Sequence, residues 1–246
     1  MNYVEVKELS KSYSDIEALK NLSLKIEAGT LFGILGPNGA GKSTLIKILA
    51  TLIEPDSGEV FINNINSINN SRKIRELIGY VAQDVALDKI LTGRELLDFQ
   101  SDLYHINRNR KIERIEKLVN QLEMNNWIDR KCGTYSGGMK RRIDLAAGLL
   151  HLPKVLILDE PTVGLDIESR NIIWQLLKEL RNDGMTIILS SHYLDEIDKL
   201  ADRLVIIDDG RVIAQGTPAE LKNKLGGDRV TLKVREFSNQ EEAKNI

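Results

Sequence analysis

The sequence predicts an α/β fold that contains one helical insertion. Short apolar runs typical of buried strands alternate with helical stretches along most of the 246 residues. The region up to about Phe61 is rich in strand patterns and holds one clear helix. Between about Thr92 and Leu150 no convincing strand is present, and apolar residues recur at helical spacing.

The first elements surround a glycine-rich loop. We expect a buried strand over residues 31–35, a helix over 43–53 and a turn over 54–58, where Pro, Asp and Gly occur together. A strand over 59–62 and an Asn-rich loop over 63–70 follow.

Two capping boxes mark the later helices. Thr92 with Glu95 opens the helical insertion, and Thr217 with Glu220 opens a helix near the C-terminus. Between them, the α/β alternation returns after about residue 150. The expected elements are strands at 155–158 and 185–189, helices at 167–183 and 193–201, and a hairpin of 204–207 with 211–214.

The composition excludes several classes of protein. Hydrophobic residues make up 42% of the chain, charged residues 28%, and the formal net charge is −2. A near-neutral chain is not expected to bind nucleic acid as its main role. The one cysteine, Cys132, cannot form an intramolecular disulfide and fits a reducing location. No secretory signal is visible, and the apolar runs are far shorter than the roughly 20 residues of a membrane-spanning helix.

One loop carries a phosphate-binding pattern. It matches G-x-x-x-x-G-K-[ST] and lies between a predicted strand and a predicted helix. Its residues are Gly36, Pro37, Asn38, Gly39, Ala40, Gly41, Lys42, Ser43 and Thr44. Glycines allow several backbone N–H groups to point at one anion, and the helix N-terminus adds partial positive charge. Lys42 is placed to contact phosphates, and Ser43 to offer its hydroxyl to Mg²⁺.

Two further segments point to the same chemistry. The strand at 155–158 ends in Asp159, a candidate Mg²⁺ ligand, and Glu160, a candidate general base. The alternative is a charged strand end that simply enters solvent. Ser136, Gly137 and Gly138 precede a helical run and form a second possible anion-binding helix start, or an ordinary helix cap.

Together these motifs resemble the nucleotide-binding subunit of ABC transporters over about residues 1–225. The phosphate loop is similar to the Walker A motif, residues 155–159 to Walker B, and residues 136–138 to the signature loop. Four residues match the Q-loop glutamine (Gln83), the D-loop aspartate (Asp166), the switch histidine (His192) and the adenine-stacking aromatic (Tyr13). Each has a structural alternative: a surface glutamine, a helix N-cap, a structural histidine and a core tyrosine.

The resemblance implies a fold and a set of ligands. The fold is a P-loop NTPase core with a mixed sheet, an N-terminal antiparallel β subdomain and an inserted helical subdomain at about 92–150. The ligands are ATP and Mg²⁺. Catalytic roles are implied for Lys42, Gln83, Glu160 and His192, metal contacts for Ser43, Gln83 and Asp159, and nucleotide contacts for the phosphate loop, Tyr13, Asp166 and residues 136–138.

The same resemblance implies partners. A second copy of the chain would supply residues 136–138 to the nucleotide, and a separate membrane permease would carry out transport. The subunit would be cytoplasmic, attached to the inner face of the cell membrane through that permease. Tyr135 and Met139 replace the usual Leu and Gln of the signature, as in exporters of the daunorubicin-resistance type, which implies export of a drug, a lipid or another small molecule.

Other nucleotide-binding classes fit less well. A soluble ABC ATPase of DNA repair or translation, which remains the alternative, usually carries a long coiled coil or two nucleotide domains. A GTPase typically carries Asn-Lys-x-Asp, and residues 223–226 lack the Asp. A regulatory module that does not hydrolyse nucleotide often lacks the carboxylate at the position of Glu160.

The C-terminal residues lie beyond the expected ATPase domain. Residues 228–235 alternate apolar and polar side chains, as a strand does, and polar residues follow. We expect residues 226–246 to be a short stub or the start of a truncated extension.

Overall fold

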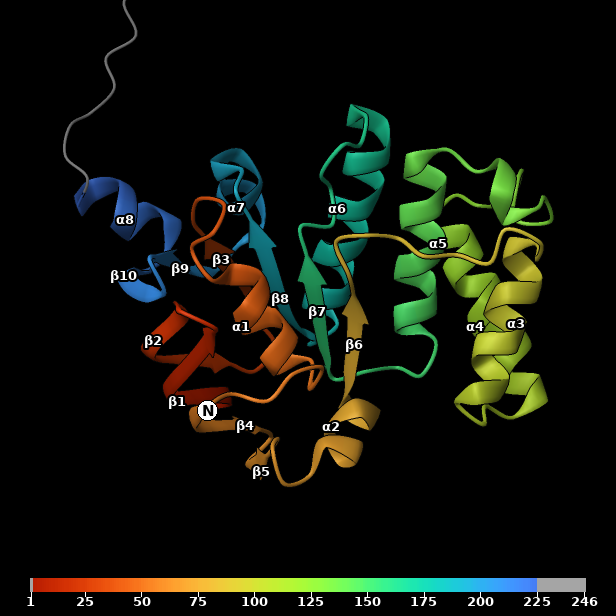
Figure 1. Ribbon diagram of the computed structural model, residues 1–246. Helices are drawn as coiled ribbons and strands as arrows, with labels where there is room; N and C mark the ends of the chain where they lie inside the picture. The colour runs from red at the N-terminus through yellow and green to blue at the C-terminus, as the bar shows by residue number, and fades with distance from the viewer. Residues whose placement is uncertain (1, 225–246) are drawn as a thin grey trace, which may run out of the picture.

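The core of the protein is a six-stranded sheet in the order β10-β9-β3-β8-β7-β6, seen in the middle of Figure 1. A computed structural model describes residues 2–224, so the predicted strand at 228–235 and the stub at 226–246 lie outside the described residues. The strands are β3 (Leu31–Leu35), β6 (Ile78–Val81), β7 (Val155–Asp159), β8 (Thr186–Ser191), β9 (Arg203–Asp208) and β10 (Arg211–Gly216). All pair in parallel except β10, so the sheet is mixed, as expected.

A second sheet is antiparallel and confirms the predicted N-terminal β subdomain. Its order is β2-β1-β4-β5. The strands are β1 (Asn2–Tyr13), β2 (Ile16–Glu27), β4 (Ser57–Ile62) and β5 (Ile65–Asn66). Helix α1 (Lys42–Leu49) lies between the two sheets, and its Leu45, Ile46 and Leu49 belong to one apolar cluster with side chains of both.

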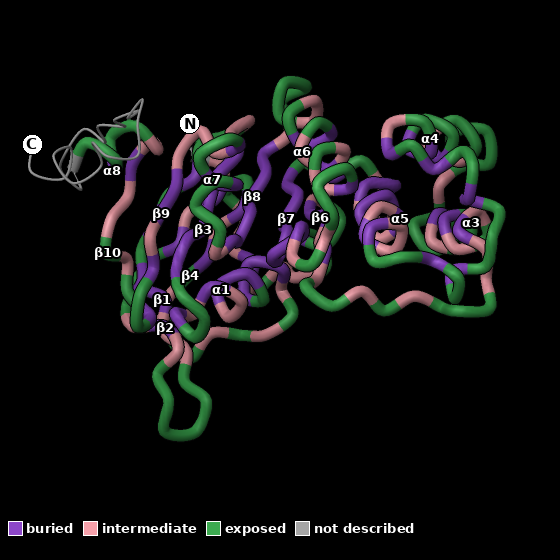
Figure 2. Tube along the Cα trace, turned by 90° about the horizontal axis from the view of Figure 1, so that it is seen from above, coloured by how far each residue is buried: buried purple, intermediate pink, exposed green. Residues whose placement is uncertain are grey.

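Successive residues of the central strands face opposite sides of the sheet. In β7, Val155 and Ile157 join the cluster around α1, whereas Leu156 and Leu158 pack toward the helices on the other face. These are α5 (Gly137–Leu149), α6 (Ile167–Asn182) and α7 (Leu194–Leu200). Since both faces are covered, these strands are continuous apolar runs, and Figure 2 shows buried residues along them.

The helical insertion lies to one side of the sheet (Figure 1). It consists of α3 (Gly93–Leu103), α4 (Arg108–Gln121), the 3₁₀ turn η1 (Cys132–Thr134) and α5. The remaining helices are α2 (Ser71–Leu77) before β6 and α8 (Pro218–Lys224) after β10. Both predicted capping boxes are confirmed, at Thr92 with Glu95 and at Thr217 with Glu220. Within residues 2–224, every helix is too short or too polar to cross a membrane.

Two predicted boundaries are wrong for local reasons. The helix expected over 43–53 ends at Leu49, because Thr51 adopts a left-handed conformation (φ 59°) and the amides of Thr51 and Leu52 donate to the carbonyls of Ile48 and Lys47. This is a Schellman motif, formed without glycine. The Asn-rich loop over 63–70 contains a two-residue hairpin turn between β4 and β5, in which Asn63 and Asn64 both have positive φ.

Tyr135 fastens the segment before α5 to the start of α3. Its side chain is buried, its ring packs edge-on against Trp127 with ring centres 4.9 Å apart, and its hydroxyl lies 3.1–3.2 Å from the carbonyl oxygens of Trp127, Ile128 and Arg130. The hydroxyl also accepts from the Gly93 amide at 3.1 Å. Burial raises the pKa of Tyr135 to about 12.

We expect Tyr135→Phe to lower the free energy of unfolding by about 1–3 kcal/mol, because it removes the buried hydroxyl and leaves the Gly93 amide only a longer hydrogen bond, of 3.4 Å, to the carbonyl oxygen of Arg130. Urea denaturation of the full chain measures this loss. The control is Tyr104→Phe, whose hydroxyl makes no hydrogen bond within residues 2–224, and which should change the free energy by less than about 0.5 kcal/mol. Equal losses in the two variants would contradict the assignment.

Asp144 is a half-buried carboxylate on α5. Burial raises its pKa from 3.8 to about 6, although Arg141 lies 3.7 Å away and acts in the opposite direction. The folded protein therefore holds this proton more tightly than the unfolded chain does. The free energy of unfolding must therefore fall as the pH rises from 3.8 to about 6. In this range the unfolded chain has lost the proton, while the folded protein still holds it.

We expect Asp144→Asn to avoid this loss, because an amide does not ionise. The variant should gain stability over wild type as pH rises through that window, by at most about 3 kcal/mol above pH 6. Thermal unfolding at pH 4 and pH 7 measures the difference, with the exposed Asp15→Asn as control. A difference that does not change with pH would show that Asp144 titrates normally.

Candidate active site

The phosphate-binding loop connects β3 to α1 in a tight curl. Gly41 has φ 101°, and a Cβ there would lie 2.4 Å from the carbonyl oxygen of Ala18. A Cβ at Gly36 would lie 2.2 Å from the carbonyl oxygen of Ile207. Both positions therefore require glycine. Gly39 is surrounded by open space, but its φ of 84° also favours glycine.

Lys42 is buried at the base of this loop. Its ammonium donates to the carbonyl oxygens of Gly36 at 2.9 Å and Pro37 at 3.0 Å, and it lies 3.5 Å from Oε1 of Glu160. The Lys42 and Glu160 side chains are only 4% and 7% exposed. Pairing lowers the cost of keeping two charges out of water.

Glu160 also contacts the next strand of the sheet. Its Oε2 lies 3.1 Å from Nδ1 of His192, and its amide donates to Oγ of Ser190 at 3.0 Å. Its φ of 47° is in the left-handed region, which costs a non-glycine residue about 1–2 kcal/mol. The structure thus holds a strained, buried carboxylate between an ammonium and an imidazole.

Asp159 lies one residue earlier, at the end of β7. Its Oδ1 accepts from Oγ of Ser190 at 2.6 Å and from Oγ of Ser43 at 3.3 Å. Ser190 stands opposite Asp159 in the parallel pairing of β7 with β8. The Ser43 hydroxyl and the Asp159 carboxylate form a set of oxygen donors that suits Mg²⁺.

A cleft of about 470 Å³ opens over the loop. Lys42, Ser43, Thr44, Glu160 and His192 line it together with Gln83, from the loop after β6, and Tyr13, from the end of β1. The remaining lining residues are Ala18, Asn38, Gly39, Gly41 and Val163. Tyr13 is 46% exposed, so it is a cleft-lining tyrosine and not a core residue.

Some of the predicted site residues lie elsewhere. Ser136 caps α5 by accepting from the Met139 amide, and none of residues 136–138 lines the cleft. A Cβ at Gly138 would lie 2.1 Å from Oγ of Ser169, whereas Gly137 faces open space. Asp166 caps α6 through two hydrogen bonds from Ser169, at 2.8 and 3.0 Å, and these bonds lower the pKa of Asp166.

The sequence reasoning missed Ser190, Ala18 and Val163. Ser190 belongs to the segment quoted for His192, but its contact with Asp159 depends on strand register, which no local pattern reveals. Val163 lies three residues after Glu160. Ala18 lies in β2, which the sequence did not resolve as a separate strand.

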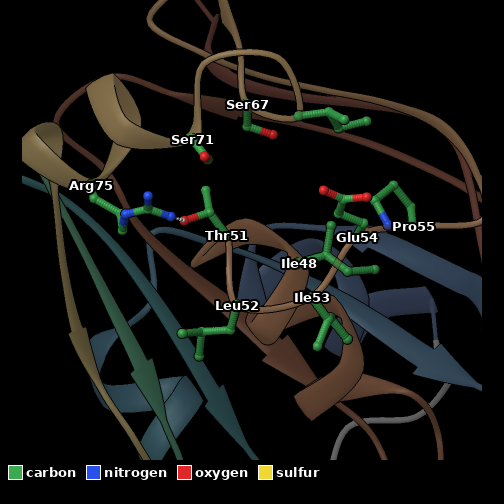
Figure 3. A pocket seen from close by; sticks show the side chains of 10 residues that line it. Ile48, Thr51, Leu52, Ile53, Glu54, Pro55, Ser67, Ser71 and Arg75 are labelled. Atoms are coloured by element: carbon green, nitrogen blue, oxygen red, sulfur yellow. Dashed lines mark hydrogen bonds between the residues drawn. The ribbon is translucent and has the colours of Figure 1, made fainter.

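A separate pocket of about 210 Å³ lies at the other end of α1. Figure 3 shows it between the end of that helix and α2, where Arg75 donates to the Thr51 hydroxyl. It shares no lining residue with the cleft over the phosphate loop. We therefore assign it no part in the chemistry of that cleft.

Comparison with known proteins gives the family. The ABC transporter family model matches residues 19–163. The daunorubicin resistance ATP-binding protein DrrA2 of Streptomyces coeruleorubidus is 42% identical, over 95% of this chain and 72% of that protein. The Nod factor export ATP-binding protein I of Rhizobium etli is 37% identical, over 94% of this chain and 73% of that protein.

A solved structure agrees with the fold. It is a dimeric ATP-binding cassette in a post-hydrolysis state with bound ADP and Pi, with a TM-score of 0.80 and 30% identity, covering 87% of this chain and 98% of that one. The predicted P-loop NTPase fold is confirmed. The chain belongs to the ABC transporter family, as a subunit that binds and hydrolyses ATP.

Proposed function

We propose that this subunit powers export through a separate membrane permease, and that the cleft over the phosphate loop is where it hydrolyses ATP. The observation that carries the proposal is the convergence of Lys42, Glu160 and His192 in one cleft. The names of the relatives refer to drug resistance and to Nod factor export, which supports the direction of transport.

Each residue of the cleft has its own role in binding or hydrolysing ATP. The loop amides and Lys42 bind the phosphates, and Tyr13 stacks on the base. Glu160 accepts a proton from the attacking water as the oxygen of that water bonds to the γ-phosphorus and the bond to ADP breaks. His192 orients Glu160 through their 3.1 Å contact, and Gln83 senses the γ-phosphate from the adjoining loop.

The oxygen donors of the cleft fit Mg²⁺. Ser43 and Asp159 would hold the ion, together with Gln83, which lines the same cleft as Ser43. Bound there, Mg²⁺ would neutralise charge on the phosphates. Within the chain, hydrogen bonds from Ser43 and Ser190 fix Oδ1 of Asp159 beside the phosphate loop.

A second copy of the chain completes each site. Residues 136–138 lie outside this chain's own cleft, and Gly137 faces open space, so the turn is free to contact nucleotide on another subunit. The dimeric relative supports this arrangement. We place Asp166 near the same dimer contact, since it lies close to Gly138.

We also propose a boundary for the ATPase domain and a cellular location for the subunit. Residues 1–225 form the ATPase domain, with the helical insertion at about 92–150. The subunit acts on the cytoplasmic side of the cell membrane, held there by its permease. Co-purification of the tagged chain with a membrane permease from detergent-solubilised cells tests this, and recovery of the chain only from the soluble fraction would favour an ABC ATPase that is not coupled to transport.

We expect Glu160→Gln to lower ATP turnover by about 10²–10⁴-fold while ATP binding stays within twofold, because the amide keeps the shape but cannot accept the proton. Steady-state phosphate release and equilibrium nucleotide binding measure the two effects. The exposed Glu168→Gln is the control. Turnover within about threefold of wild type would remove Glu160 as the base.

Gly137→Arg should leave ATP binding by the isolated subunit within twofold and abolish turnover, because the new side chain has room in this chain but would block the partner's site. The exposed Asn109→Arg, in the first turn of α4, is the control. A dimer with one Gly137→Arg copy should keep one active site. Two fully active sites in that mixed dimer would defeat the shared-site arrangement.

A further inference from the structure

The loop that carries Gln83 is attached to the segment that leads into α5. This loop, residues 82–92, joins β6 to α3 and crosses from the central sheet to the helical insertion (Figure 1). Gln83 lies at its start, on the wall of the cleft. The structure holds the loop at both ends.

Arg141 holds the first end. This residue is on α5, one turn after Ser136–Gly138, and only 4% of it is exposed. One guanidinium nitrogen donates to the carbonyl oxygen of Ala82 and the other to that of Gln83. The planar fork of arginine matches two neighbouring acceptors, which the point charge of lysine does not.

Backbone hydrogen bonds hold the second end. The Cys132 amide donates to the carbonyl oxygen of Leu91 at 2.8 Å, and the Gly133 amide donates to that of Lys89 at 3.2 Å. The residues involved immediately precede the Ser136–Gly138 turn. Both ends of the loop are therefore bound to one short stretch of chain, residues 132–141.

The neighbouring arginine provides a contrast. Arg142 donates to the carbonyl oxygens of Leu122 and Glu123 and lies over the ring of Trp127. Its contacts stay within the helical insertion. Two adjacent arginines on one helix thus bind backbone carbonyls, but only Arg141 reaches the loop of Gln83.

We propose that Arg141 is a positioning residue that fixes Gln83 to the Ser136–Gly138 turn, so that the two move as one body. This rests on the proposed function, in which Gln83 contacts the nucleotide of its own subunit and the turn contacts that of the partner. Nucleotide contact at Gln83 then changes the placement of the turn in the other site. Each site is coupled to its neighbour through Arg141.

The first test measures the attachment without nucleotide. Spin labels at Ala86→Cys, in the loop, and Lys117→Cys, on α4, both at exposed positions, report the spread of distances between loop and insertion. Arg141→Lys and Arg141→Gln should at least double the width of that distribution in the full chain. Arg142→Lys should leave it unchanged.

The second test measures the consequence for turnover. If each site needs the partner's turn, wild-type turnover should be cooperative in ATP. Arg141→Lys should lower kcat at least tenfold and bring the Hill coefficient to about 1, while ATP affinity of the isolated subunit stays within twofold. Arg142→Lys should retain cooperativity, and thermal unfolding of all variants identifies any that fail to fold.

Different results would contradict the role of Arg141 and the shared nucleotide sites of the proposed function. An unchanged distance distribution in Arg141→Lys and Arg141→Gln, or the same broadening in Arg142→Lys, would overturn it. So would a broadened distribution with kcat and cooperativity as in wild type, because Arg141 would then hold the loop without positioning Gln83. Non-cooperative wild-type turnover would instead contradict the shared sites of the proposed function, and the label distances would still decide whether Arg141 holds the loop.

Discussion

The parallel pairing of β3, β8 and β7 is the constraint on which the site depends. Parallel strands bring their carboxyl ends to one edge, and there the register sets Asp159 opposite Ser190 and the phosphate loop after Leu35. The phosphate loop lies more than one hundred residues before the acidic strand end and His192 in the sequence, yet the three meet at this edge. A slip of one residue between β7 and β8 would turn the Asp159 side chain toward the opposite face of the sheet.

The charged side chains at the base of the cleft, Lys42 and Glu160, are buried, which is costly unless each charge has a partner. In the structure Lys42 is held by two loop carbonyls and by Glu160, and Glu160 in turn by His192. On the proposed function, phosphate oxygens would compete with both the carbonyls and the carboxylate for Lys42. Their arrival would weaken the hold of Lys42 on Glu160, whose left-handed backbone stays fixed by the amide contacts with Ser190.

The parts of the fold that sequence predicts well are those encoded locally. The phosphate loop, the two capping boxes and the hairpin around Gly210 each depend on residues within a few positions of one another, and all form as expected. Prediction fails where the determinant is local but unusual, as with left-handed Thr51 ending α1 without glycine. It also fails where the determinant is tertiary: neither the contact of Ser190 with Asp159 nor the reach of Arg141 to Ala82 leaves a local pattern.

The packing explains the departure from the usual signature at Tyr135. Leucine at 135 would fill much of the same space but could neither accept from the Gly93 amide nor donate to the carbonyl oxygens of Trp127, Ile128 and Arg130. Tyr135 therefore joins the Ser136–Gly138 turn to α3, Arg141 joins this turn to the loop of Gln83, and Gly138 packs it against α6. A turn held from three directions is pre-organised, and on the proposed function it would present its glycines to a partner. A displacement at any of the three contacts would then be passed on to the turn.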